Sequence, residues 1–242
     1  MLMGPQNLPE QVRILRNRID SAAKAAMRNV DSVTLLAVSK AQPANMVRAV
    51  AQLGVRDIGE SYVQEALEKI EALRDVSLTW HFVGRLQANK TRAVAAAFDW
   101  VHAVDRLKIA ERLSEQRPFH APPLNVCLQV NIDSETSKGG VTTAELPALA
   151  TAVAALPRLK LRGLMCIPPD EDDPARQRKW FATMRRALEE LNAAGAGLDT
   201  LSMGMSDDFE SAILEGATLV RIGTALFGPR SGANAATHAK PQ

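Results

Sequence analysis

The stretch Thr34-Leu-Leu-Ala-Val-Ser-Lys-Ala-Gln-Pro43 decides between the two folds that the rest of this chain allows. Its first half is an apolar run that ends at Lys40, which is typical of a buried strand. Its second half is the first turn between a strand and a helix, and this turn contains no glycine. An open, doubly wound sheet carries a glycine-rich phosphate-binding sequence at that point. The stretch therefore favours a closed barrel over an open sheet.

Strand-like and helix-like segments alternate along the rest of the chain, with short connections between them. The predicted strands are 34–38, 57–59, 79–83, 100–103, 125–132, 161–167, 200–203 and 219–222. The predicted helices are 8–29, before the first strand, then 44–53, 62–73, 89–97, 107–116, 143–155, 176–194 and 207–215, with a further short helix after Gly223. About eight strand–helix units in roughly 200–250 residues match a barrel with parallel strands. The sequence predicts an α/β protein, a single (β/α)8 TIM-type barrel with an extra N-terminal helix.

Composition excludes several classes of function. Hydrophobic residues make up 46% of the 242 residues and charged residues 23%, which is typical of a soluble globular protein. A net charge of +2 and a single tyrosine give no basic or aromatic surface for nucleic acid. The two cysteines lie in predicted strands, as expected for reduced core thiols. No signal peptide and no membrane-spanning apolar stretch are evident, so we expect a cytoplasmic protein.

No composition shift divides the chain, so we expect one domain over residues 1–242. Its core is expected over about 8–230, and the tail 231–242 has little to bury and is expected to be disordered. The loop 133–140 contains Lys138 and two glycines. It is either a mobile lid or an ordinary connection, and the sequence leaves both interpretations open.

The lysine that ends the first strand is the first candidate functional residue. Alternation along a strand places Leu36, Val38 and Lys40 on one face. Removal of a lysine from water lowers its pKa and frees the amine as a nucleophile, which is how Schiff-base lysines arise. The alternative is a lysine that closes the strand by extending into solvent. Because functional residues of a barrel gather at the carboxyl ends of its strands, Lys40 would lie at the mouth of the barrel.

The ends of the last two strands resemble a phosphate site. Ser206 precedes a run of acidic residues, so we expect it to cap a helix whose N-terminus offers free N–H groups. If Val220 and Ile222 pack outward against helices, Arg221 points into the barrel. Gly223 and Thr224 would then supply N–H and hydroxyl donors at the rim. The alternative is that Ser206 only starts a helix; Lys40 on the adjacent first strand favours the functional interpretation.

A Schiff-base lysine, a phosphate site and an inward arginine together suggest pyridoxal 5′-phosphate (PLP). Lys40 would bond the aldehyde, the phosphate site would hold the ester, and Arg221 would face the pyridine nitrogen. Arginine does not readily give up its proton, so it keeps that nitrogen unprotonated. The ring is then a weaker electron sink, which is the property that most PLP catalysis uses.

Four ordered motifs resemble one known family, the PLP homeostasis proteins, which are related to the N-terminal barrel of alanine racemase. These motifs are Leu36-Ala-Val-Ser-Lys40, Trp80-His-Phe-Val-Gly-Arg-Leu-Gln-Ala-Asn-Lys90, Leu201-Ser-Met-Gly-Met-Ser206 and Arg221-Ile-Gly-Thr-Ala-Leu-Phe-Gly228. The resemblance implies a barrel with PLP on Lys40, phosphate contacts from Ser206, Gly223 and Thr224, and Arg221 near the pyridine nitrogen. Where the family has Gly-Glu-Asn-Tyr, this chain has Gly59-Glu60-Ser61-Tyr62. A cofactor contact from Ser61 would reach less far than one from asparagine.

Three functions share this set of residues. An amino-acid racemase needs an acid–base group on each face of the PLP adduct, and the only tyrosine, Tyr62, has no evident reason to oppose Lys40. A Schiff-base aldolase for a phosphorylated sugar would need acid–base partners that the sequence does not identify. The third function is non-enzymatic: the protein binds PLP and sequesters, buffers or delivers it to apo PLP-dependent enzymes. The resemblance favours this third function, with no catalytic residue and a monomeric chain expected.

Two histidines in predicted strands, His81 and His102, lack the partner ligands at short spacing that a metal site needs. We expect them to be hydrogen-bonded core or rim residues rather than metal ligands. Glu60, at the end of the second predicted strand, is expected either to polarise a nearby group or to form a salt bridge.

Overall fold

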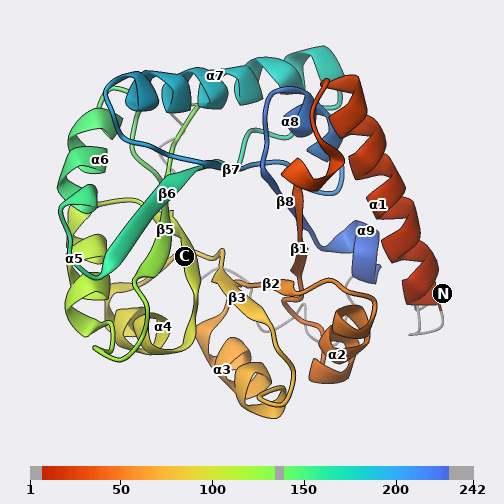
Figure 1. Cartoon of the computed structure of the whole chain (residues 1–242), viewed down its shortest axis with the longest axis horizontal. Helices are drawn as coiled ribbons and strands as arrows, with labels where there is room; N and C mark the ends of the chain where they lie inside the picture. Colours follow the sequence, from red (N-terminus) through yellow and green to blue (C-terminus); the bar gives the residue numbers. More distant parts are fainter. Residues whose placement is uncertain (1–6, 134–138, 229–242) are drawn as a thin grey trace, which may run out of the picture.

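The chain forms a closed barrel of eight parallel strands with helices around the outside (Figure 1). The computed structural model describes residues 7–133 and 139–228. The strands follow one another around the barrel in chain order, and β1 pairs with β8 to close it. Their bounds are β1 Thr34–Val38, β2 Asp57–Glu60, β3 Thr79–Phe82, β4 Trp100–Val104, β5 Leu124–Gln129, β6 Leu159–Met165, β7 Thr200–Ser202 and β8 Leu219–Ile222. The predicted fold is confirmed.

Helices on the outer side of the barrel connect successive strands, and one more, α9, follows the last strand. They are α2 Ala44–Gln52, α3 Val63–Ala72, α4 Thr91–Ala97, α5 Leu107–Gln116, α6 Leu146–Ala154, α7 Pro174–Ala193, α8 Phe209–Leu214 and α9 Thr224–Phe227, with 3-10 turns at Val30–Ser32 and Ala88–Lys90. The predicted extra helix is α1 Leu8–Ala25, which packs beside α8 and α9 outside the ring (Figure 1). Its buried residues recur at helical spacing, so one face covers the barrel and the other meets solvent.

The core lies mainly between the strands and the helices. Val220 and Ile222 of β8 belong to this outer cluster, as expected for side chains that point outward. A smaller apolar cluster fills the inside of the barrel, with Ala103, Cys127 and Met165 packed against Trp100. Both cysteines are buried and free, as predicted. Within the described residues, no helix combines the length and apolarity needed to cross a bilayer.

Two predicted strands end elsewhere in the structure. β5 stops at Gln129: the Val130 N–H still donates to the Met165 carbonyl of β6, but the Asn131 N–H donates to the Val141 carbonyl instead of continuing the ladder. β6 begins at Leu159, two residues before its predicted start, and ends at Met165. The remaining strands differ from their predicted ranges by one residue or none.

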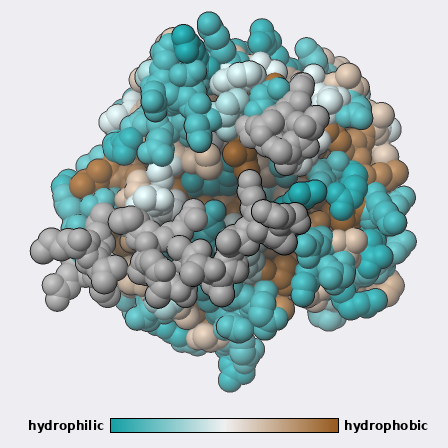
Figure 2. Space-filling view, turned by 180° about the vertical axis from the view of Figure 1, so that it is seen from behind, coloured by the Kyte–Doolittle hydropathy of each residue, from teal (hydrophilic) through white to brown (hydrophobic). Residues whose placement is uncertain are grey.

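Hydrophilic residues dominate the face of the molecule opposite to that of Figure 1, and hydrophobic residues show in the recesses between them (Figure 2). The predicted tail 231–242 and Lys138 of the loop 133–140 lie outside the described residues.

Candidate functional site

The predicted site residues lie together at the carboxyl ends of strands, around a cavity of about 210 Å³. All six line it: Lys40, Ser61, Ser206, Arg221, Gly223 and Thr224. The other lining residues are Val38, Val83, Ile167, Met205 and Asp207. The cavity therefore combines an amine, a guanidinium, hydroxyl groups and a small apolar wall, and it draws them from both ends of the chain.

Closure of the barrel brings its first and last strands together. β1 and β8 are parallel neighbours with Leu36 opposite Arg221 and Ala37 opposite Ile222. Paired residues share a face of the sheet, so Arg221 faces the barrel interior with Leu36. Lys40 follows on the same face at the end of β1 and is partly exposed at the cavity. The inward direction predicted for Arg221 is the direction seen.

Ion pairs and hydrogen bonds around Lys69 of α3 fix the turn that carries Lys40. Lys69 Nζ donates to the Ser39 carbonyl at 2.7 Å and to Glu60 Oε1 at 2.6 Å. Its third partner is Glu65 Oε1, at 2.6 Å, which also accepts the N–H of Ala41 at 2.6 Å. The backbone on both sides of Lys40 is therefore bonded to this cluster.

The geometry of the turn is unusual for its sequence. Ala41 has a φ of 63°, in the left-handed region that residues other than glycine rarely adopt. The hydrogen bond from its N–H to Glu65 holds it there. This cluster was not predicted from the sequence, although the i, i+4 spacing of Glu65 and Lys69 on the predicted helix 62–73 indicates an ion pair.

Glu60 is a salt-bridge partner, one of the two roles expected for it. Its side chain is fully buried, and Oε1 accepts from both Lys69 and the Ser39 hydroxyl, the latter at 2.5 Å. Burial raises the pKa of Glu60, while the Lys69 ammonium and the Ser39 hydroxyl act in the opposite direction. Within the described residues, Oε2 has no hydrogen-bond partner. The Lys69 ammonium therefore compensates the buried negative charge of Glu60.

Arg221 is a buried cation with uncharged partners. Its guanidinium donates to the carbonyl and hydroxyl of Ser202 at 2.5 and 2.9 Å, and to the Cys166 carbonyl at 2.7 Å. In the described part of the chain no carboxylate forms an ion pair with it, and burial lowers the pKa of the guanidinium. Because arginine has five N–H donors, these three bonds leave two for an acceptor in the cavity.

The loop after β7 and the start of α9 meet at the other side of the cavity. The Ser206 hydroxyl accepts the N–H of Ala225 at 3.2 Å. The amide of Thr224, the first residue of α9, has no acceptor within the residues that the structure describes. Gly223 and Thr224 are partly or fully exposed at this rim. These donors could hold an anionic group.

The role predicted for Ser206 as the N-cap of the following helix is wrong. That helix, α8, begins at Phe209 with Asp208 in the N-cap position. The Asp208 side chain accepts the N–H of Met205, which folds the intervening residues into a turn and delays the helix by two residues. Glu210, in the first turn of α8, bonds Arg18 of α1. Ser206 is thereby left to bond the start of α9.

Gly84 allows the loops after β2 and β3 to meet beside the cavity. A Cβ atom at this position would lie 2.3 Å from the carbonyl oxygen of Ser61, a distance that no side chain tolerates. Substitution of Gly84 would therefore displace the Ser61 loop. This close approach explains why the motif around residue 84 contains glycine.

The two histidines lie inside the barrel, in the core rather than at the rim, and both are hydrogen-bonded as expected. His81 and His102 are buried, and Nδ1 of the first lies 2.9 Å from Nε2 of the second. Across the described residues, no group of three or more His, Cys, Asp and Glu side chains could hold a metal ion.

A larger cavity of about 590 Å³ lies on the outer side of the Lys40 turn. Its lining is Ala41, Gln42, Pro43, Ala44, Glu65, Glu68, Lys69 and Ala72. The charges here are two carboxylates and an ammonium that is already bonded to carboxylates. This surface does not suit an anionic ligand, and Lys40 is not part of it.

Comparison with known proteins gives consistent results. The profile of the alanine racemase N-terminal domain matches residues 13–231. The pyridoxal phosphate homeostasis protein of Pseudomonas aeruginosa is 58% identical over 223 residues, which cover 92% of this chain and 96% of that protein. The structure of PipY from Synechococcus elongatus with PLP bound has 39% identity and a TM-score of 0.77, covering 87% of this chain and 100% of that one.

Alanine racemase from Corynebacterium glutamicum is a more distant structural relative. It has 20% identity and a TM-score of 0.68, and the match covers 93% of this chain but 61% of the racemase. At this identity the likeness concerns the fold alone.

Proposed function

Because this chain belongs to the family of pyridoxal phosphate homeostasis proteins and carries the alanine racemase N-terminal domain, we propose that it binds PLP through a Schiff base on Lys40. We further propose that it acts in intracellular PLP homeostasis, by sequestering, buffering or delivering the cofactor. One observation carries the proposal: an amine, a buried guanidinium and several uncharged donors line a single cavity. PLP has a matching aldehyde, ring nitrogen and phosphate.

Each of the six predicted site residues matches one group of PLP. The amine of Lys40 bonds the aldehyde carbon, and Ser206, Gly223 and Thr224 donate to the phosphate. Ser61 adds a hydroxyl on the neighbouring loop. When bound, PLP supplies an electrophilic carbon conjugated to an electron-withdrawing ring. Arg221 donates to the pyridine nitrogen and, since it keeps its own proton, leaves that nitrogen uncharged.

This arrangement supports storage of PLP rather than catalysis. An uncharged pyridine nitrogen weakens the ring as an electron sink. Racemisation also needs a second acid–base group opposite the lysine. Tyr62 is at the N-cap of α3 and is not among the residues that line the cavity, and the lining carboxyl group, Asp207, is exposed. We therefore propose that the protein has no catalytic activity of its own.

Borohydride reduction tests the Schiff base directly. The protein loaded with PLP should be yellow, and reduction followed by peptide mass spectrometry should find a pyridoxyl group on Lys40. Lys40→Ala should remove both signals, whereas Lys90→Ala, at an exposed position, should keep them. A pyridoxyl group on another lysine, or a colourless protein that traps a phosphosugar instead, would contradict the proposal.

Two further measurements separate storage from catalysis. The loaded protein should pass PLP to an apo PLP-dependent enzyme faster than Lys40→Ala does, with recovered enzyme activity as the readout. In D2O, the Cα proton of alanine should not exchange in its presence. Exchange above the rate of free PLP would favour a racemase. Sedimentation velocity should give a monomer.

A further inference from the structure

A row of polar side chains crosses the barrel from the cavity to the opposite end. The Ser202 hydroxyl, which bonds Arg221, lies 2.8 Å from Nδ1 of His102. His102 Nε2 lies 2.9 Å from Nδ1 of His81, and His81 Nε2 lies 3.0 Å from Asp57 Oδ1. The five residues come from β8, β7, β4, β3 and β2. Barrel interiors are usually filled by branched apolar side chains, so this row is unusual.

The two ends of the row differ in their access to solvent. Ser202, His102 and His81 have at most 1% of their surface exposed. The Asp57 side chain is 31% exposed and lines a second cavity, of about 440 Å³, beside the start of β1. Arg221, at the other end, lines the cavity that contains Lys40. The row therefore joins two cavities through the buried interior of the barrel.

The chemistry of the ends sets one direction for every hydrogen bond. Arginine can only donate, so Ser202 Oγ accepts from Arg221 and its own proton goes to His102 Nδ1. His102 then carries its proton on Nε2 and donates to His81 Nδ1. His81 in turn donates from Nε2 to the Asp57 carboxylate, which can only accept. Both imidazoles are neutral in this arrangement.

The opposite direction needs an additional proton. If His81 donated to His102, and His102 to Ser202, then a bare His81 Nε2 would face the bare Asp57 carboxylate. Ser202 would accept two donors and leave its own proton without a place in the row. Burial lowers the pKa of His102 well below its usual value, and the Arg221 cation adds to the effect. With both imidazoles neutral and Asp57 ionised, only the direction that begins at Arg221 and ends at Asp57 gives every hydrogen bond of the row one proton.

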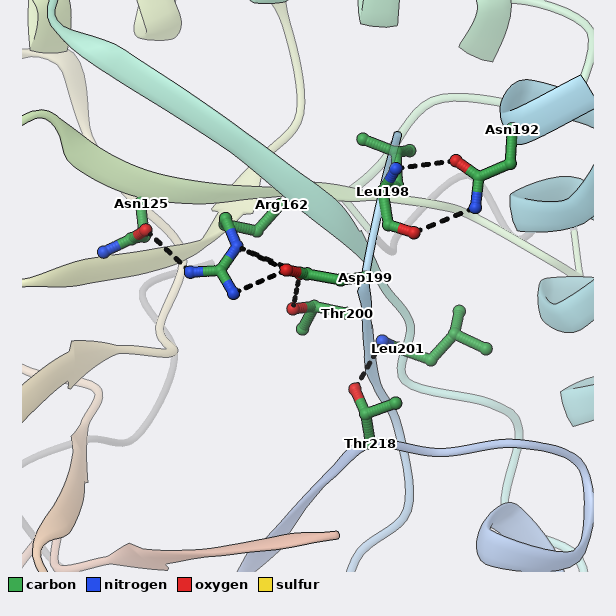
Figure 3. Close-up of polar contacts among 8 residues, drawn as sticks. All are labelled: Asn125, Arg162, Asn192, Leu198, Asp199, Thr200, Leu201 and Thr218. Atoms are coloured by element: carbon green, nitrogen blue, oxygen red, sulfur yellow. Dashed lines mark hydrogen bonds and ion pairs between the residues drawn. The ribbon is translucent and has the colours of Figure 1, made fainter. Parts of the chain in front are cut away.

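The surroundings of His81 hold its ring in place. Trp100 stacks on it with the ring centres 5.4 Å apart and 14° between the planes. The Arg162 guanidinium lies 4.8 Å from the Trp100 ring and pairs with Asp199 at 2.7 Å. Figure 3 shows Arg162 bonded both to Asp199 and to Asn125 on the neighbouring strand. The stacked Trp100 ring, which Arg162 covers, fixes the plane of the His81 ring, so the two nitrogens of His81 point along the row.

We propose that His102 and His81, anchored by Asp57, are positioning residues that orient the Ser202 hydroxyl and thereby hold Arg221 as a donor toward the PLP ring. The part of this proposal that concerns PLP rests on the proposed function, whereas the direction of the hydrogen bonds in the row concerns the chain alone. Hydrogen bonds in such a row polarise one another. Loss of the bond between His102 and Ser202 therefore also weakens the bond between Ser202 and Arg221.

Nitrogen NMR of the full-length chain without PLP tests the direction. The chain has four histidines, which single His→Gln variants assign. We expect His81 and His102 to carry a proton on Nε2 and none on Nδ1 at pH 7.5. A proton on Nδ1 of either residue would overturn the proposal.

Two substitutions at one position test the positioning role. Asparagine places its amide near the position of Nδ1, and glutamine near that of Nε2. His102→Asn should keep the bond to Ser202 and retain PLP within about threefold of the wild-type affinity, whereas His102→Gln should lose about tenfold. The same order should appear in the shift of the Arg221 Nε–H signal without PLP. Equal effects of both variants would mean that His102 only fills space.

The two proposals fail in different ways. If the wild-type chain takes up no PLP, the proposed function and the role of Arg221 toward the ring both fall. The nitrogen spectrum still decides the direction of the row in that case. If PLP binds but the imidazoles carry Nδ1 protons, only the positioning proposal is overturned.

Discussion

Replacement of Lys69 by methionine should destabilise the protein by about 3–5 kcal/mol at pH 8. Lys69 Nζ donates three hydrogen bonds of 2.6 to 2.7 Å, two of them to Glu60 and Glu65. Methionine keeps the volume of the stem but leaves the Glu60 charge buried without a cation. Removal of one partner of a buried ion pair has this magnitude because the remaining charge is uncompensated.

The loss should depend on pH in a defined direction. Burial raises the pKa of Glu60 above its unfolded value, so in the acidic range the native state binds this proton more readily than the unfolded state. Stability then falls as pH rises from the unfolded to the folded pKa, and this penalty is absent below the unfolded pKa. Without Lys69, which lowers the pKa, the folded value rises further and the range widens. The deficit of Lys69→Met should therefore be smaller at pH 5.5 than at pH 8.

Urea unfolding followed by tryptophan fluorescence at both pH values measures the effect. The double variant Glu60→Gln/Lys69→Met removes the charge along with its partner and should regain most of the loss at pH 8. A deficit that is equal at the two pH values, or that grows toward pH 5.5, would refute the reasoning. So would a double variant as unstable as Lys69→Met.

Three further outcomes are expected. Thr224→Ala should weaken PLP binding by about 1–3 kcal/mol in equilibrium dialysis if its hydroxyl donates to the charged phosphate, and an unchanged affinity would exclude that contact. Arg162→Ala should lower the free energy of unfolding in urea by about 1 kcal/mol, because it removes the partly exposed Asp199 pair and the Trp100 contact at the far end of the barrel, and an unchanged value would mean that neither contact contributes. Burial raises the pKa of Cys127 and Cys166 to about 12, so neither should react with DTNB at pH 8 in the native protein. Both should react after unfolding in guanidinium, and a fast native reaction would mean that one of them is accessible.

The barrel could be predicted because its strands are short apolar runs with turn residues between them. Thr34–Val38 and Leu219–Ile222 have the predicted bounds, since alternation and flanking polar residues mark both ends. Local turns were harder to predict from the sequence. The delay of α8 depends on a bond from Met205 to Asp208, which competes with the capping pattern at Ser206 and has no distinct sequence sign.

The gathering of the six site residues around one cavity could also be predicted, because barrel topology brings strand ends together. The parts that sequence analysis missed are long-range polar contacts. The Lys69 cluster joins α3 to β1 and β2, and the row from Asp57 to Arg221 joins five strands. Such contacts depend on side-chain reach and register across the barrel, which hydrophobic periodicity does not encode.

The pairing of β1 with β8 also bears on how the protein is made. During translation Lys40 leaves the ribosome well before Arg221, Gly223 and Thr224 do. No nascent chain that lacks β8 has both walls of the cavity, because the register of Leu36 with Arg221 creates it. Ligand capture is thus restricted to chains that include β8, and a product truncated before β8 cannot withdraw a reactive aldehyde from the cell's pool.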